Sequence, residues 1–158
     1  MLDHTDIEIL DALLTDARIS WVDLGARIKL SGPATAERVK RLEAKGVIKE
    51  FRTEICPDAL GLRILAYVSV TLENVKYRES FLKGINALPQ VLEAQFIAGN
   101  DDYLLKVRAL NPQSLDDLLN SGIKAIEGVA TTRTVVALST AKNVPVSVGT
   151  AGERNVLR

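Results

Sequence analysis

The chain has little of what usually marks an enzyme, a metal site or an exported protein. Cys56 is the only cysteine and His4 the only histidine among 158 residues. A single cysteine excludes an intrachain disulfide and favours a reducing compartment. The sequence also has no nucleophile–base pair, no metal-ligand spacing and no glycine-rich phosphate loop. We therefore predict that the protein is not an enzyme and uses neither a metal nor a cofactor.

Two further absences concern targeting and the core. The amino terminus lacks the basic stretch of a signal peptide, and no apolar run approaches the roughly 20 residues that a membrane helix needs. We therefore expect a cytoplasmic protein with no membrane contact. Aromatic residues make up only 4% of the chain, so its cores must be built from Leu, Ile, Val and Ala.

The charges are unevenly distributed although the net charge is zero. Residues 27–52 contain eight basic and three acidic residues, whereas residues 1–26 contain six acidic residues and one arginine, Arg18. A local basic face on a neutral protein can still bind phosphates. The distribution therefore points to nucleic-acid binding near residues 27–52.

The first 30 residues have the pattern of two helices. One is predicted from Thr5 to Thr15, with an apolar stripe formed by Ile7, Leu10, Leu13 and Leu14. The next begins after an N-cap at Ser20, and Asp23 is expected to complete a capping box.

A third helix follows after a tight turn. Ser31 is the expected N-cap, Pro33 suits the first turn, and Gly46 supplies the left-handed stop. Its apolar side is formed by Ala36, Val39 and Leu42. Two short helices joined in this way can place the second one in the major groove of DNA.

From residue 48 the pattern becomes rich in strands. Ile48–Ile55 is interpreted as either a short wing or a connecting strand, and Pro57 and Gly61 then break the chain. Strands are predicted at 62–72, 91–98, 103–109 and 129–139, and helices at 77–88 and 112–126. This β-α-β-β-α-β order is that of the ferredoxin-like fold, in which two helices cover one face of an antiparallel sheet. The fold class is therefore α+β, a winged helix-turn-helix domain followed by a ferredoxin-like domain.

The predicted sheet has apolar side chains on both faces. Along the first strand, one face is formed by Ile64, Ala66, Val68 and Val70. The other face also has apolar residues, because the following cannot all lie on the helix side: Leu65, Tyr67, Val68, Val107 and Val136. A second apolar face needs a second cover, and a copy of the same domain is the simplest one. We therefore expect a two-fold homodimer.

Several segments carry a family resemblance. They are LDHTDIEIL at 2–10, DARIS at 16–20, ERVKRLE at 37–43 with GVI at 46–48, GNDDYLL at 99–105 and TRT at 132–134. Together with the order of elements, they resemble the Lrp/AsnC family, the feast/famine transcription regulators, over nearly the whole chain.

The resemblance implies a transcription regulator with an N-terminal DNA reader. It also implies a C-terminal domain that dimerises, assembles dimers into a larger ring such as an octamer, and binds an amino acid between subunits. On this basis residues 1–50 are expected to bind DNA, 51–61 to link the domains, 62–140 to bind ligand and form oligomers, and 141–158 to form a tail with a mobile end.

The candidate DNA contacts lie on or beside the third helix. They are Ser31, Thr35, Arg38, Lys40, Arg41 and Lys45. Hydroxyl groups at the helix start can reach a phosphate or a base edge, and the guanidinium of Arg38 can pair with guanine. The alternative is a solvated basic face with ion pairs such as Glu37–Arg41.

The candidate effector contacts lie on a predicted hairpin turn and on the last strand. They are Gly99, Asn100, Asp102, Thr132 and Thr134. Free N–H groups of a turn can hold a carboxylate, and Asp102 can hold an ammonium group. The alternative is a plain turn in which Gly99 and Asn100 only supply positive φ.

Three functions remain open at this point. The first is a regulator whose assembly or DNA affinity is changed by an amino acid, and the second is an architectural DNA-binding protein of the same fold without an effector. The third, an enzyme of amino-acid metabolism, is disfavoured by the missing catalytic groups.

Overall fold

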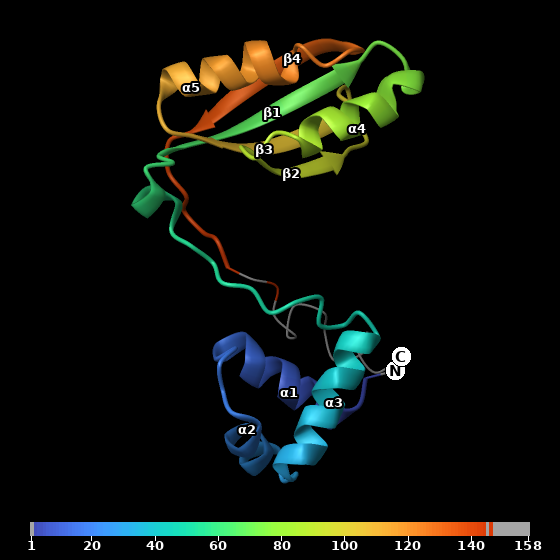
Figure 1. Cartoon of the computed structure of the whole chain (residues 1–158), viewed down its shortest axis with the longest axis vertical. Coiled ribbons are helices and arrows are strands. Elements are labelled where there is room, and N and C mark those ends of the chain that lie inside the picture. Colours follow the sequence, from blue (N-terminus) through green and yellow to red (C-terminus); the bar gives the residue numbers. More distant parts are fainter. Residues whose placement is uncertain (1, 145, 147–158) are drawn as a thin grey trace. The chain divides into compact units, whose positions relative to one another are not determined.

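The computed structural model describes residues 2–144 and residue 146, which fall into two compact units (Figure 1). Residues up to 54 belong to one unit, together with the described residues after 141, and residues 55–141 form the other. The mobile end predicted for the tail, residues 147–158, lies outside the described residues. None of the described helices has the length and apolar composition of a membrane span.

The first unit contains three helices, as predicted. They are α1 (His4–Thr15), α2 (Trp21–Ile28) and α3 (Gly32–Ala44). Their common core is formed by Ile9, Leu13, Ile19, Leu24, Val39 and Leu42. The core is aliphatic, as the scarcity of aromatic residues requires.

The apolar stripe predicted for α1 is confirmed only in part, since Leu13 is buried and Leu10 packs on the core. Ile9 is fully buried, whereas Ile7 is only half-buried and Leu14 is exposed. The side of α1 that faces inward is formed by Asp6, Ile9 and Leu13. A polar residue therefore takes an inward position that an apolar pattern alone does not reveal.

The turn between α2 and α3 depends on a close backbone approach. Lys29 ends α2 in the left-handed conformation, with φ of 58°. The N–H of Leu30 then donates to the carbonyl oxygen of Gly25 over 2.9 Å. Ser31 begins α3 as predicted, because its side-chain oxygen accepts a hydrogen bond from the N–H of Ala34 at 3.3 Å.

Two other local predictions need correction. Ser20 caps α2, but the carboxylate of Asp23 accepts a bond from the hydroxyl of Ser20 and not from its backbone N–H, so the capping box is incomplete. The segment Ile48–Ile55 contains neither a wing nor a strand. Ile48 packs on the helical core, while Phe51 is exposed and has no neighbouring strand with which to pair.

The second unit is a four-stranded antiparallel sheet in the order β2-β3-β1-β4. Its strands are β1 (Ile64–Leu72), β2 (Val91–Phe96), β3 (Tyr103–Ala109) and β4 (Val129–Ala137). The helices are α4 (Arg78–Asn86) and α5 (Pro112–Asp117), and α5 continues as η3 (Leu118–Ile123). A short turn, η1 (Pro57–Leu60), precedes β1, and another, η2 (Val75–Tyr77), precedes α4. The predicted order of elements and the ferredoxin-like topology are confirmed.

The helices lie on one face of the sheet (Figure 1). Alternate residues of β1, including Ala66, Val68 and Val70, are completely buried against them. Val107 is buried in the same core, and Val136 pairs with Ala66. The expectation that the named apolar residues do not all lie on the helix side is confirmed, because the strand register turns Val68, Val107 and Val136 toward the helices and leaves Leu65 and Tyr67 on the opposite face.

The opposite face of the sheet carries both apolar and charged side chains. Its register positions include Leu65, Tyr67, Leu104 and Val135. Lys106 and Glu93 form an ion pair there, with Nζ and Oε1 separated by 2.8 Å. Tyr67 is 37% exposed and Val135 62% exposed in the isolated chain. This face holds apolar side chains that no part of residues 2–144 covers completely.

Gly25→Ala should destabilise the helix-turn-helix unit by about 1–3 kcal/mol, the usual cost of overpacking. A Cβ atom at Gly25 would lie 2.5 Å from the carbonyl oxygen of Leu30 and 2.9 Å from Oγ1 of Thr35. Urea unfolding followed by the fluorescence of Trp21, the single tryptophan, reports on this unit. Gly99→Ala is the control because a Cβ there meets nothing within 4 Å. Equal midpoints for Gly25→Ala and the wild type would contradict the tight turn.

Candidate DNA-binding and ligand-binding sites

The inward side of α3 fixes which of its residues can face DNA. Thr35, Val39 and Leu42 follow one another at helical spacing and are all buried. Thr35 is 0% exposed, and its hydroxyl donates to the carbonyl oxygen of Ser31 over 3.0 Å. This corrects the expectation that the Thr35 hydroxyl reaches DNA, since the group is enclosed and its proton is already used.

Three of the predicted DNA contacts are exposed and take part in none of the ion pairs of the described residues. Ser31 and Lys40 are exposed on α3, and Lys45 is exposed at its carboxyl end. Ser31 lies at the amino terminus of the helix, where the free N–H groups and the helix dipole favour an anion. These residues offer a hydroxyl and two ammonium groups for phosphate contacts.

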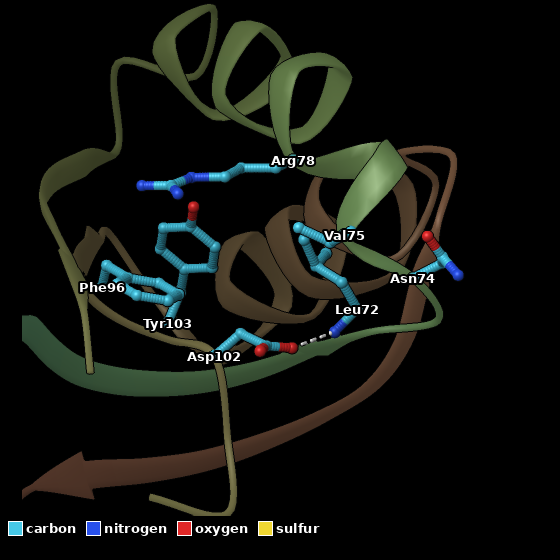
Figure 2. Close-up of a pocket in the computed structure, with 7 residues that line it drawn as sticks. All are labelled: Leu72, Asn74, Val75, Arg78, Phe96, Asp102 and Tyr103. Carbon is cyan, nitrogen blue, oxygen red and sulfur yellow. Dashed lines mark hydrogen bonds between the residues drawn. The ribbon is translucent and has the colours of Figure 1, made fainter. Parts of the chain in front are cut away.

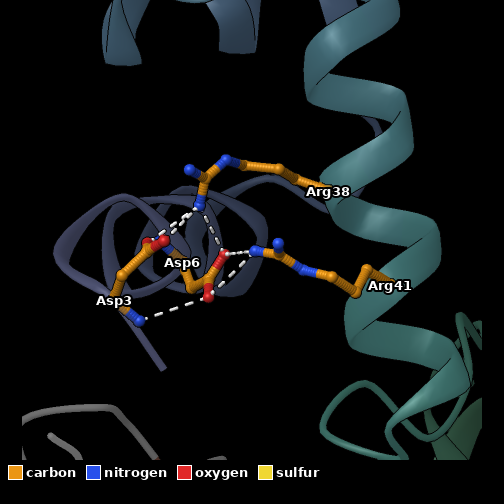
Figure 3. Close-up of polar contacts among 4 residues, drawn as sticks. All are labelled: Asp3, Asp6, Arg38 and Arg41. Carbon is orange, nitrogen blue, oxygen red and sulfur yellow. Dashed lines mark hydrogen bonds and ion pairs between the residues drawn. The ribbon is translucent and has the colours of Figure 1, made fainter. Parts of the chain in front are cut away.

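Arg38 and Arg41 lie in a polar cluster with two carboxylates of α1, a group that we call the Asp–Arg cluster: Asp3, Asp6, Arg38 and Arg41 (Figure 3). Arg38 Nη1 donates to Asp3 Oδ2 at 2.6 Å and to Asp6 Oδ1 at 2.9 Å. Arg41 Nη2 donates to Asp6 Oδ1 at 3.0 Å. Both guanidinium groups are therefore paired with carboxylates in this structure, and the reading of a guanine by Arg38 stays a prediction.

The same carboxylates also cap α1. The N–H of Asp6 donates to Asp3 Oδ1 at 2.8 Å, and the N–H of Asp3 donates to Asp6 Oδ2 at 3.2 Å. This reciprocal arrangement is a capping box in which both members are acidic. The cluster therefore ties the start of α1 to the middle of α3.

Charge pairing changes the ionisation of the exposed member of the cluster. The hydrogen bond from Arg38 is the main reason that the pKa of the Asp3 carboxyl lies below its usual range, and the N–H of Asp6 adds to the effect. The hydrogen bond to Asp3 raises the pKa of the Arg38 guanidinium in return.

The spacing of the charged residues in the sequence could have predicted this cluster, although the overall distribution of charge did not indicate it. Asp3 and Asp6 are three residues apart on one helix, and Arg38 and Arg41 are three residues apart on another. Residues at this spacing share a helix face, so the two pairs are matched in geometry as well as in charge. The alternative Glu37–Arg41 pair is absent from the described structure, in which Arg41 pairs with Asp6.

In the second unit, the loop between β2 and β3 is held by its two aspartates. Leu72 donates its N–H to Asp102 Oδ2 at 2.7 Å, and Asp102 donates its own N–H to the carbonyl oxygen of Val70 at 2.9 Å. Asp101 pairs with Arg133 and accepts a bond from the Thr71 hydroxyl at 3.2 Å.

The other predicted effector residues are not brought together. Gly99 and Asn100 are exposed, and neither has positive φ, so the alternative in which they only supply positive φ is wrong, while their contact with an effector stays a prediction. Thr132 and Thr134 pair with Val70 and Val68 on the face of the sheet that the helices cover. Of the five predicted residues, Asp102 lines a pocket of the described structure.

That pocket has a volume of about 120 Å³ and lies between the end of β1, the start of α4 and the β2–β3 loop. We call it the Asp102 pocket; it is lined by Leu72, Asn74, Val75, Arg78, Phe96, Asp102 and Tyr103 (Figure 2). The guanidinium carbon of Arg78 lies 4.7 Å from the centre of the Phe96 ring, a cation–π contact. The pocket thus presents a cation, an anion and apolar walls.

Tyr103 brings a buried hydroxyl without a hydrogen-bond partner among the described residues to the Asp102 pocket. The residue is 2% exposed. Its ring packs between Phe81 and Phe96, with ring centres 4.8 and 5.4 Å away. Neither Tyr103 nor Arg78 was among the predicted effector contacts, because their approach to each other depends on the tertiary fold.

Two family models match the chain along most of its length. The AsnC-type helix-turn-helix domain covers residues 2–43, and the Lrp/AsnC ligand binding domain covers residues 65–146. The chain belongs to the Lrp/AsnC family. The resemblance drawn from the sequence motifs is thereby confirmed.

Named relatives of this Lrp/AsnC protein are transcription regulators. It is 38% identical to the HTH-type transcriptional regulator LrpC of Bacillus subtilis over 75% of this chain and 82% of that protein. It is 37% identical to the leucine-responsive regulatory protein of Haemophilus influenzae over 89% of this chain and 86% of that protein. Among solved structures, it resembles a Neisseria meningitidis transcriptional regulator in complex with L-methionine, with a TM-score of 0.86 and 26% identity over 91% and 94% of the two chains.

The helix-turn-helix unit should lose stability as the pH falls below about 4, because Asp3 must then be protonated. A carboxyl whose pKa is lowered by folding stabilises the folded state above its unfolded pKa and loses that contribution as the pH falls through its folded pKa. Asp3→Asn should remove this part of the pH dependence. Urea unfolding of both proteins, followed by Trp21 fluorescence between neutral and acid pH, measures it. Parallel pH profiles would show that the Asp3–Arg38 contact does not form in solution.

Proposed function

We propose that this Lrp/AsnC-type transcription regulator contacts double-stranded DNA through the exposed side of α3 and responds to an amino acid bound in its C-terminal unit. The observation that carries the proposal is the combination, in one chain, of an AsnC-type helix-turn-helix and a ligand-binding domain of the same family. Neither half has a catalytic constellation among the described residues, and no group of three metal-ligating side chains is found there.

The exposed surface of α3 supports contact with phosphates more than extensive base reading. Lys40 and Lys45 carry its unpaired positive charges, and Ser31 lies at the helix start. Ala34 and Pro33 are also exposed there and offer only apolar contacts, such as those made with a thymine methyl group. Sequence selection would then depend on few polar groups.

The Asp102 pocket matches the chemical groups of an amino acid. Its carboxylate can hold an ammonium group, Arg78 can hold a carboxylate, and Leu72, Val75 and Phe96 can pack on an apolar side chain. One named relative is leucine-responsive, and one structural neighbour is a complex with L-methionine. We therefore propose an apolar amino acid as the effector, with Asp102 as the residue most directly involved.

The open face of the sheet supports the proposed homodimer. Leu65, Tyr67, Leu104 and Val135 share this face, and a second copy would remove their exposed area from water. Assembly of dimers into a larger ring, such as an octamer, and the placing of the effector between subunits are further parts of the proposal. The expected location is the cytoplasm, where DNA and free amino acids are both accessible.

Lys40→Gln should weaken binding to a mixed-sequence DNA duplex and reduce the salt dependence of binding. Each lost phosphate contact lowers the magnitude of the slope of log affinity against log salt concentration by about 0.9. Fluorescence anisotropy over a range of potassium chloride concentrations measures the slope. Lys83→Gln, which removes an exposed lysine from α4 of the other unit, is the charge-matched control. If both variants behave alike, α3 does not form the DNA surface.

Apolar amino acids should raise the melting temperature of the C-terminal unit in a screen of the twenty amino acids. A ligand at 100 times its dissociation constant adds about 2.7 kcal/mol of stability. Asp102→Asn should abolish the rise while keeping the fold, because the amide oxygen can still accept the N–H of Leu72. Asp58→Asn is the control, an exposed carboxyl of the same unit. No shift for any amino acid would favour the effector-independent architectural protein.

A further inference from the structure

The Asp–Arg cluster has a property that helix packing alone does not require. Asp6 is a carboxylate that is only 1% exposed, and a buried charge is tolerated only when it is paired and hydrogen-bonded. Its two oxygens accept bonds from the Asp3 N–H, from Arg38 and from Arg41. The partners of this buried charge therefore come largely from the recognition helix.

The cluster is also electrically balanced. Two carboxylates face two guanidinium groups, so the four side chains together add no net positive charge to the surface of α3. The contacts are close enough to compete with other anions, since Arg38 meets Asp3 Oδ2 at 2.6 Å and Asp6 Oδ1 at 2.9 Å. Arg38 is also only 28% exposed.

A free arginine on a recognition helix has a strong effect on DNA binding. Its guanidinium fits a phosphate or the O6 and N7 atoms of guanine with two parallel hydrogen bonds. Two unpaired arginines beside Lys40 would raise affinity for DNA of any sequence. Pairing them inside the domain removes this source of indiscriminate binding.

We infer that Asp6, with Asp3, is a positioning residue for DNA recognition: it holds Arg38 and Arg41 against α1 and so keeps both guanidinium groups out of the DNA contact. The inference rests on the proposed contact between α3 and DNA. On this view Arg38 and Arg41 neutralise the carboxylates of Asp3 and Asp6 within the domain. The phosphate contacts are then made by Lys40 and Lys45.

The test compares wild type, Asp6→Asn and Asp3→Asn in binding to a mixed-sequence duplex over a range of salt concentrations. Asparagine keeps the size of the side chain and removes its charge. Each released guanidinium that reaches a phosphate should steepen the salt slope by up to about 0.9 and raise affinity at low salt. Asp3→Asn removes the exposed one of the two carboxylates that hold Arg38 and leaves the contact with Asp6, so a smaller steepening is expected, and this variant keeps the test valid if Asp6→Asn fails to fold.

Two controls separate positioning from other effects. Asp11→Asn removes an exposed charge from the same helix and has no arginine partner in the described structure, so its slope should equal that of the wild type. Arg38→Gln should leave the wild-type slope unchanged, and in the Asp3→Asn background it should reverse the steepening. A merely structural role would lower stability and affinity without steepening the slope.

The outcomes distinguish the two proposals. A steeper slope in Asp3→Asn or Asp6→Asn that Arg38→Gln reverses supports the positioning role. Unchanged or shallower slopes in folded variants overturn it while leaving DNA binding by the wild type intact. A shallower slope for Arg38→Gln alone also overturns it, because Arg38 would then contact DNA. Absence of binding by the wild type would overturn the proposed function itself.

Discussion

Burial of a single side of α3 is the constraint on which the DNA-binding unit depends. Thr35, Val39 and Leu42 must face the helical core, and this sets the rotation of the helix about its axis. Arg38 and Arg41 are then directed to α1, where two carboxylates neutralise them. The exposed side of α3 consequently carries fewer unpaired positive charges than the composition of the helix suggests.

In the C-terminal unit, too, burial of one side of an element decides which residues are exposed, and in a strand the buried side consists of every second residue. Alternate residues of β1 are buried under α4 and α5, so the intervening residues form an open face suited to a second copy of the chain. Where β1 ends, its backbone is tied to the β2–β3 loop by the contact between Leu72 and Asp102. This contact places a carboxylate beside Arg78, Phe96 and Tyr103.

The sequence was informative wherever a local pattern decided the structure. Periodicity and turn residues predicted all four strands and the helices α4 and α5 of the C-terminal unit, though not the short turns η1 and η2, and the Gly-Asn-Asp-Asp-Tyr motif pointed to Asp102. The sequence did not predict contacts between residues that lie far apart along the chain. Arg38 and Asp3 are 35 residues apart, Arg78 meets Phe96 only in the folded unit, and Thr35 is buried despite its hydroxyl. Helical patterning also left the phase of α1 ambiguous, because Asp6 occupies an inward position.

The central claim is that one chain couples amino-acid binding to DNA binding, and linkage offers the most direct test. If an amino acid changes the affinity for DNA, then DNA must change the affinity for that amino acid by the same factor. Calorimetric titration of the amino acid into the free protein and into its DNA complex gives both dissociation constants. The account predicts that the two constants differ. Equal constants, or no amino-acid binding to either form, would contradict it.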